Sequence, residues 1–265
     1  MSQNLIFQTL AELEVRGEPA ALCTVISSSG STPRHAGSKM LVFADGTFSG
    51  TVGGGDLEHR VLEEARAALV DGVPRMVEYT LAEPARGDPG VCGGTVEVFV
   101  DPILPPPTLI VVGGGHVGKA VAHLGKWLGF RVAISDDRAE FCTPEANPDA
   151  DVFYPGPLAE LPKRLTISPR TWFVLTTRGV AVDVGGLPAL LDSPAAYIGV
   201  IGSKRRWATA LKQLKEAGVP EENLSRVHSP MGLELRAETP EEIAVSIMAE
   251  IIMLRNAGSG KPMKG

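Results

Sequence analysis

The sequence predicts an α/β protein, with a doubly wound parallel sheet in its C-terminal part and a smaller α+β domain in its N-terminal part. Three observations lead to this prediction. Strand and helix patterns alternate after residue 107, the first hundred residues hold short strands joined by turn signals, and four prolines fall between positions 102 and 107. Alternating strands and helices are typical of a parallel sheet, and clustered prolines stiffen a linker. We expect a first domain over residues 1–102, a proline-rich linker over 103–107, a second domain over 108–230, a C-terminal helix region over 231–258 and a frayed tail over 259–265.

The composition argues against several classes of protein. The 265 residues carry 25 Lys and Arg against 31 Asp and Glu, a formal charge of −6, which provides no general basic surface for nucleic acid or an anionic membrane. No run of about 18 apolar residues is present, and the N-terminus lacks the pattern of a signal peptide. The three cysteines match neither a disulfide framework nor a zinc-ligand spacing. We expect a cytoplasmic globular protein that binds neither nucleic acid nor membrane and uses no protein-ligated metal.

The elements of the first domain follow from short local patterns. Asp45-Gly46 marks a hairpin turn, because this pair tolerates the positive φ angles of tight hairpins. Asp56 is a suitable N-cap for a helix that ends near Gly72. In order, we expect an amphipathic helix around residues 5–13, strands at 20–26 and 40–43, the hairpin, the helix from 56, and strands at 75–80 and 95–100.

Two features of this domain are candidate ligand contacts. Gly53, Gly54 and Gly55 lead directly into a helix, and such a start offers backbone N–H groups to an anion. Cys92 precedes two glycines and is the thiol best placed to meet a ligand, although a free cysteine is as often a small buried hydrophobic residue.

The second domain is expected to alternate strands and helices up to a last, well-specified helix. Thr239 and Glu242 form a capping box, and Pro240 occupies the first helical position, where it needs no N–H partner. Gly258 is placed to end this helix, which should be buried nearly all round because only two polar residues interrupt its apolar surface. We expect strands at 108–112, 131–135, 172–176 and 197–201, and helices ending near 128, 191, 217 and 256.

A glycine-rich turn between the first strand and helix of this domain is the main candidate site. Gly113, Gly115 and Gly118 have GxGxxG spacing, and Asp136 and Asp137 end the next strand, which is where a Rossmann-like dinucleotide domain places a ribose-binding acid. Such glycines let a phosphate approach the backbone. The alternative is that they serve only tight packing of strand against helix. The candidate residues are Gly113, Gly114, Gly115, His116, Val117, Gly118, Asp136 and Asp137.

Cations follow other strands of the same predicted sheet. Arg138 follows one strand, and Gly202, Ser203 and Lys204 with two arginines follow another. Cations in the first turn of a helix oppose its dipole at a cost of a few tenths of a kcal/mol each, which a bound anion would offset. A solvated basic face explains the run equally well.

The chain as a whole resembles one protein family. The segments STPRHAGSKMLVFADGTFSGTVGGGDLEHRVLEEA, VCGG, GGGHVGKAVA with DDR, YIGVIGSKRR and HSPMGLELRAETPEEIAVSIMAEI are together similar to the XdhC/CoxI family of accessory proteins for molybdenum hydroxylases. The resemblance implies a dimeric cytoplasmic chaperone, rather than an enzyme, that binds molybdenum cofactor and supports its sulfuration by a cysteine desulfurase. It further implies insertion of the cofactor into an apo molybdenum hydroxylase such as xanthine dehydrogenase.

On this resemblance the glycines from Gly113 to Gly118 would hold phosphate, those from Gly53 to Gly55 would approach the pterin, and Cys92 would lie near the metal end. One loop departs from the family pattern: Thr176-Thr177-Arg178 stands where members often have Thr-His-Asp, so no role is carried over there. Two other functions stay open from the residues alone. The glycine turn fits an NAD(P)-dependent oxidoreductase, and it also fits a nucleotide-binding sensor without turnover.

Overall fold

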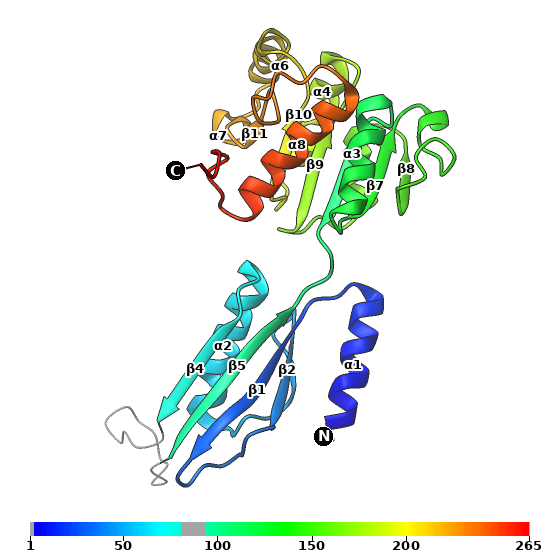
Figure 1. Cartoon of the computed structure of the whole chain (residues 1–265). Helices are drawn as coiled ribbons and strands as arrows, with labels where there is room; N and C mark the ends of the chain where they lie inside the picture. The colour runs from blue at the N-terminus through cyan, green and yellow to red at the C-terminus, as the bar shows by residue number, and fades with distance from the viewer. Residues whose placement is uncertain (1–2, 81–93, 265) are drawn as a thin grey trace. The chain divides into compact units, whose positions relative to one another are not determined.

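The computed structural model describes residues 3–80 and 94–264. It divides into two compact units, residues 1–105 and 106–265, each with its own hydrophobic clusters. Within the described ranges, no helix is long and apolar enough to cross a membrane. The mixed α/β class predicted from the sequence is confirmed, with an antiparallel sheet in the first unit and a parallel sheet in the second (Figure 1).

The first unit is a five-stranded antiparallel sheet with one helix on each face (Figure 1). The strand order is β3-β2-β1-β5-β4. Helix α2 packs its apolar side on a cluster from β1, β2, β4 and β5, and α1 packs on the opposite face. The elements are α1 (Gln3–Arg16), β1 (Ala20–Ser29), β2 (Lys39–Phe43), β3 (Phe48–Gly50), α2 (Gly55–Asp71), β4 (Arg75–Thr80) and β5 (Thr95–Ile103).

The predicted hairpin is confirmed, but the start of the following helix is not where the sequence placed it. Gly46 takes a φ of 81° between the paired strands β2 and β3. Helix α2 begins at Gly55 with Gly54 as its N-cap, so Asp56 lies in the first turn instead of capping it. Its carboxylate accepts a hydrogen bond from Tyr79 and pairs with Arg60. The prediction failed because positive-φ glycines extend the helix start toward the N-terminus.

The second unit is a six-stranded parallel sheet in the order β11-β10-β9-β6-β7-β8. This is the order of a Rossmann-like sheet, whose topological switch lies between β6 and β9. The strands are β6 (Thr108–Val112), β7 (Arg131–Asp136), β8 (Val152–Pro155), β9 (Thr171–Leu175), β10 (Tyr197–Val200) and β11 (Val227–His228). The helices are α3 (His116–Trp127), α4 (Val180–Gly186), α5 (Pro188–Leu191), α6 (Lys204–Glu216), α7 (Glu221–Leu224), α8 (Pro240–Arg255) and the 3-10 turns η2 (Ala139–Phe141) and η3 (Leu158–Lys163).

The two faces of the parallel sheet are covered differently. Helices α3 and α8 lie side by side on one face (Figure 1). The opposite face packs against η3, α5, α6 and α7. The connection from β8 to β9 carries only the short 3-10 turn η3, whereas a crossover between parallel strands usually contains an α-helix.

Helix α8 has the predicted start but not the predicted burial. The capping box of Thr239 and Glu242 is present, with Pro240 in the first turn. One side of the helix remains accessible, since Val245 is 50% exposed, so the expectation of burial all round is wrong. At the other end Ala257 takes the left-handed conformation, and the N–H of Gly258 donates to Met253 O, which closes the helix.

Candidate phosphate-binding site

The glycine turn between β6 and α3 is shaped mostly by the protein's own packing. Gly113 has a φ of 109°, and a Cβ there would lie 2.7 Å from Thr176 O at the end of β9. A Cβ on Gly114 would lie 2.8 Å from the Asn147 side chain, and one on Gly118 would collide with the carbonyl of Gly113. These three glycines are therefore required by the fold itself.

Gly115 is different, because nothing in the fold requires it to be glycine. Its φ is −72°, and a Cβ built on it would meet no atom within 4 Å. It is the N-cap of α3 and makes no side-chain cap bond. The backbone N–H groups of Gly115, His116 and Val117 donate to no residue in the described ranges. Open space and unpaired donors at a helix start are the features that a phosphate group needs.

Asp136, at the end of β7, binds the fold instead of facing a ligand. The residue is 4% exposed, and its carboxylate accepts from the N–H of Gly114 at 2.9 Å. Arg138 donates to the same carboxylate from its backbone N–H and from two guanidinium nitrogens, at 2.9 to 3.0 Å. Two carboxylate oxygens accept about four hydrogen bonds, so this group is filled. A ribose hydroxyl would have to displace Arg138.

Asp137 and Arg178 form a second ion pair at the same edge of the sheet. The guanidinium of Arg178, which follows β9, donates to both carboxylate oxygens of Asp137, at 2.5 and 2.8 Å. Strand β6 lies between β7 and β9 in the sheet, so the pair spans the carboxyl end of β6. The hydrogen bonds from Arg178 lower the pKa of Asp137 to about 2.

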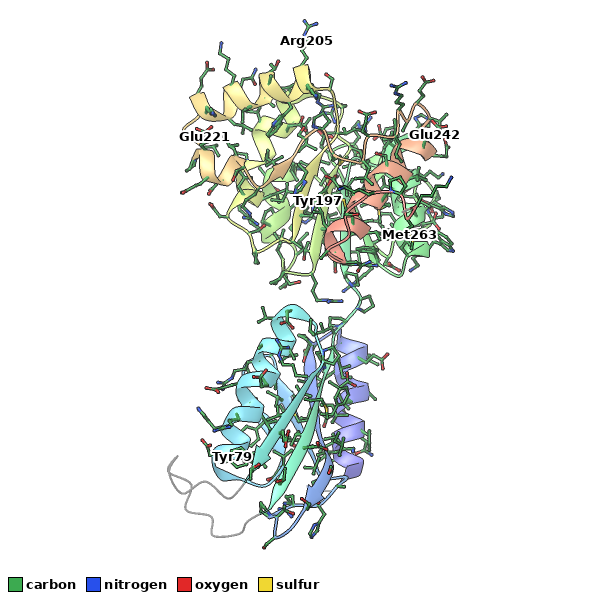
Figure 2. All side chains as sticks on the ribbon, turned by 60° about the vertical axis from the view of Figure 1, so that its left-hand side comes forward. Tyr79, Tyr197, Arg205, Glu221, Glu242 and Met263 are labelled. Carbon is green, nitrogen blue, oxygen red and sulfur yellow. The ribbon has the colours of Figure 1, made fainter. Side chains whose placement is uncertain are left out.

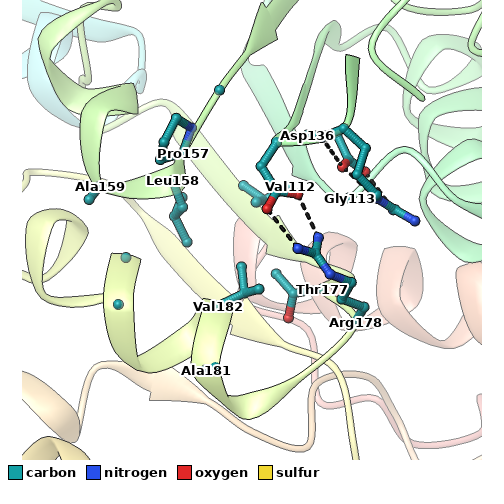
Figure 3. A pocket seen from close by; sticks show the side chains of 15 residues that line it. Val112, Gly113, Asp136, Pro157, Leu158, Ala159, Thr177, Arg178, Ala181 and Val182 are labelled. Atoms are coloured by element: carbon teal, nitrogen blue, oxygen red, sulfur yellow. Dashed lines mark hydrogen bonds and ion pairs between the residues drawn. The ribbon is translucent and has the colours of Figure 1, made fainter. Parts of the chain in front are cut away.

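A cavity of about 200 Å³ lies beside these ion pairs (Figure 3). Gly113, Asp136 and Arg178 lie along one side, and Pro157, Leu158 and Ala159 lie opposite (Figure 3). The remaining wall comes from small and aliphatic residues of α4, which include Ala181, Val182, Gly185 and Gly186. Such a wall fits a flat ring, and the charged rim fits a polar substituent.

Two segments of this cavity, residues 156–159 and 181–186, were not among the site residues predicted from the sequence. The spacing of small residues, Gly156, Ala159, Ala181 and Gly185, is the signal that was available. It identifies a site only once the β8–β9 crossover and α4 are known to lie against the end of β6. The structure does bring together Gly113, Asp136, Asp137 and Arg138 from the sequence-based set.

The basic run after β10 divides into a structural part and an exposed part. Ser203 caps α6 by accepting from the N–H of Arg206. Arg206 donates to the fully buried Asp183 at 2.7 Å and to Thr177. Lys204 and Arg205 are exposed, and Figure 2 shows Arg205 projecting away from the ribbon. Of the described residues that line the cavity, none comes from 202–206.

In the first unit, the turn from Gly53 to Gly55 already holds a carboxylate. The N–H of Gly54 donates to Glu58 at 3.0 Å, and Thr51 bonds both Glu58 and the N–H of Gly53. An external anion would compete with Glu58 at this turn. Cys92 lies outside the described residues, and burial raises the pKa of the Cys23 thiol to about 12.

The fold and the glycine turn define a two-unit α/β protein whose second unit is a Rossmann-like domain. The chain belongs to the XdhC and CoxI family. The family model described as the XdhC Rossmann domain matches residues 109–251, and the model described as the XdhC and CoxI family matches residues 13–80.

Three curated relatives are similar to this chain. It is 37% identical over 257 residues to a protein of Escherichia coli K12 named "Uncharacterized protein YqeB", a match that covers 96% of this chain and 47% of that protein. It is 34% identical over 161 residues to a probable xanthine dehydrogenase subunit of Bacillus subtilis, covering 61% and 47%. It is 23% identical to "Molybdenum cofactor insertion chaperone PaoD" of Escherichia coli K12, covering 94% and 88%.

The chain thus spans about half the length of the first two relatives. A solved structure described as a xanthine dehydrogenase from Bacillus halodurans covers 99% of this chain and 98% of its own, with a TM-score of 0.51 and 24% identity. This likeness concerns the fold.

Proposed function

We propose that this chain is an accessory protein that binds molybdenum cofactor as cargo and delivers it to an apo molybdenum hydroxylase such as xanthine dehydrogenase. The membership in the XdhC and CoxI family supports this proposal, as does the similarity to a relative named as a molybdenum cofactor insertion chaperone over 94% of this chain. In this role the protein is a carrier and partner, not a catalyst. It acts in the cytoplasm, as a homodimer.

The single structural observation that carries the binding site is Gly115. Its glycine has no packing reason, and the N–H groups at the start of α3 have no partner in the described chain. Molybdenum cofactor carries its phosphate either alone or within a dinucleotide. We place that phosphate at Gly115 to Val117, with His116 and Gly118 in the same turn, and the neighbouring cavity takes a flat ring of the cargo.

Three further parts of the proposal extend the same role. A cysteine desulfurase meets the loaded chain and supports sulfuration of the cargo. The exposed Lys204 beside Ser203 and Gly202 adds positive potential for the anionic cargo. The turn from Gly53 to Gly55 and Cys92 belong to the first unit and serve the pterin and metal ends.

A nicotinamide oxidoreductase is the second candidate, because the strand order and the glycine turn match a dinucleotide domain. The filled carboxylate of Asp136 counts against it, since that group would otherwise accept the ribose hydroxyls of NAD. We therefore propose that any NAD(P) binding is weak and without turnover.

A transfer assay tests the proposed function. Apo xanthine dehydrogenase is incubated anaerobically with molybdenum cofactor, with and without the full chain, and hydroxylase activity is measured afterwards. We expect the chain to accelerate activation and to protect the cofactor from loss. Equal activation with bovine serum albumin in place of the chain would contradict the proposal.

A further inference from the structure

The second unit contains another hollow, at the amino ends of its strands. The hollow has a volume of about 530 Å³ and lies between the starts of β6, β7 and β8 and residues 163–166. It exists because the β8–β9 crossover is built from the short turn η3, where an α-helix would usually cover the sheet. Its size falls within the range of roughly 300 to 1,000 Å³ that is usual for small-molecule sites.

Three cations line the hollow, and none of the described residues that line it is acidic. The cations are Arg131, Lys163 and Arg164. Neither the Arg131 guanidinium nor the Lys163 ammonium forms an ion pair or hydrogen bond with any described residue. This excess of positive charge stands out in a chain whose formal charge is −6. An anionic ligand would relieve the repulsion among the three cations.

Arg164 is held in place, unlike its two neighbours. Its guanidinium donates to Pro155 O at 2.5 Å and lies 5.6 Å from the centre of the Tyr154 ring. A guanidinium fixed in this way retains donors for an incoming anion at little cost in side-chain entropy.

The floor of the hollow is apolar and aromatic. Ile110 is 1% exposed and Ala133 is 3% exposed, and both lie in the strands beneath it. Tyr154 and Val152 complete the floor, and Thr108 and Thr166 lie at its margin. A floor of this kind accommodates a flat ring, and the cations above it accommodate a charged group.

We propose that this amino-end hollow binds a phosphomonoester carried on a planar ring, of which a nucleoside monophosphate is the simplest example. Three cations favour a doubly charged group over a single carboxylate, and arginine binds phosphate through paired hydrogen bonds. The site is separate from the glycine turn, which lies at the opposite, carboxyl end of β6. Binding at the hollow is therefore independent of whether the chain carries molybdenum cofactor.

Isothermal titration of the full chain with adenosine monophosphate tests this assignment. The Gly115→Asp variant is used as the background, so that the glycine turn is closed to anions. In this background Arg131→Gln combined with Lys163→Gln should weaken binding at least about tenfold, because two charge-assisted contacts are removed. Both side chains are exposed and unpaired, so the fold should be unaffected. The matched control is Lys212→Gln combined with Lys261→Gln, which removes two exposed charges elsewhere and should leave binding unchanged.

Inorganic phosphate serves as the second probe. We expect it to bind more weakly than adenosine monophosphate, since it leaves the Tyr154 floor uncovered. Equal affinity for the two probes would overturn the ring part of the assignment. Adenosine monophosphate binding that survives the Arg131→Gln and Lys163→Gln changes, or that is absent from the Gly115→Asp chain, would overturn the site itself.

Discussion

At the scale of single residues, the four glycines of the β6–α3 turn divide into two kinds. Gly113, Gly114 and Gly118 are required because a side chain would collide with Thr176, Asn147 or the turn itself. Gly115 meets nothing, so its missing side chain leaves room for something outside the chain. The sequence alone could not make this distinction, because GxGxxG spacing is the same for packing glycines and for phosphate-binding ones.

Asp136 illustrates a second limit of sequence reasoning. Its position after β7 matched the ribose-binding acid of a dinucleotide domain. In the structure its carboxylate is occupied by Gly114 and by Arg138, only two residues further along the chain. The side-chain direction of Arg138 cannot be read from sequence, so the ion pair was not predictable.

Gly115→Asp separates folding from binding. Aspartate is a strong N-cap and places a negative charge at the positive end of the α3 dipole. We expect the free energy of unfolding to stay equal or to rise by about 0.5 kcal/mol. Urea denaturation followed by tryptophan fluorescence measures this, because all three tryptophans lie in the second unit. A marked loss of stability would contradict the open environment of Gly115.

Arg178→Gln tests the ion pair across the end of β6. Without the guanidinium, the pKa of Asp137 should rise from about 2 toward its ordinary value of 3.8. A lowered pKa in the folded state contributes stability above the unfolded pKa, so the wild-type pair should lose its contribution as pH falls from about 4 to 2. Carbon-13 NMR titration of the aspartate carboxyls measures the pKa directly. An Asp137 pKa that stays near 2 in this variant, as it should in a Lys261→Gln control, would show that Arg178 is not the cause.

At the scale of elements, the start of α6 is tied to α4 by a buried ion pair. Asp183 in α4 is fully buried and accepts from Thr177 and from Arg206 in the first turn of α6. The basic run therefore includes one residue whose role is structural, which the interpretation of the run as a single anion site did not foresee. By contrast, the start of α8 was predicted correctly, because a capping box depends only on residues three positions apart.

Asp183→Asn should destabilise the second unit by about 3 kcal/mol, because it leaves the Arg206 guanidinium without its counter-charge. Urea denaturation with the same tryptophan signal measures the change. The double variant Asp183→Asn with Arg206→Met should recover part of the loss, since it removes the unpaired charge as well. A single variant as stable as wild type would show that the pair contributes nothing to the junction of α4 and α6.

At the scale of the whole molecule, the division into an antiparallel and a parallel part was predictable from the order of elements. Local patterns located most strands, and the alternation of strands and helices fixed the parallel class. The cavities were not predictable, because both depend on where the β8–β9 crossover lies against the sheet. The shortness of η3 decides this, and no local pattern encodes it.

The two units should fold independently, because their hydrophobic clusters share no residues. The clusters of the first unit use residues up to 100, and those of the second use residues from 109 onward. A fragment of residues 106–265 should show the same tryptophan-detected urea midpoint as the full chain, within about 0.3 M. A fragment that lacks a cooperative transition would contradict this independence.

The most direct test of the central claim is anaerobic binding of molybdenum cofactor to the wild-type chain and to Gly115→Asp, with Gly115→Asn as a neutral control of similar size. NADH is titrated in parallel. We expect saturable cofactor binding by wild type, a loss of at least about tenfold for Gly115→Asp, a smaller loss for Gly115→Asn, and weak NADH binding throughout. Tight NADH binding without retention of the cofactor, or equal cofactor binding by all three chains, would contradict the claim.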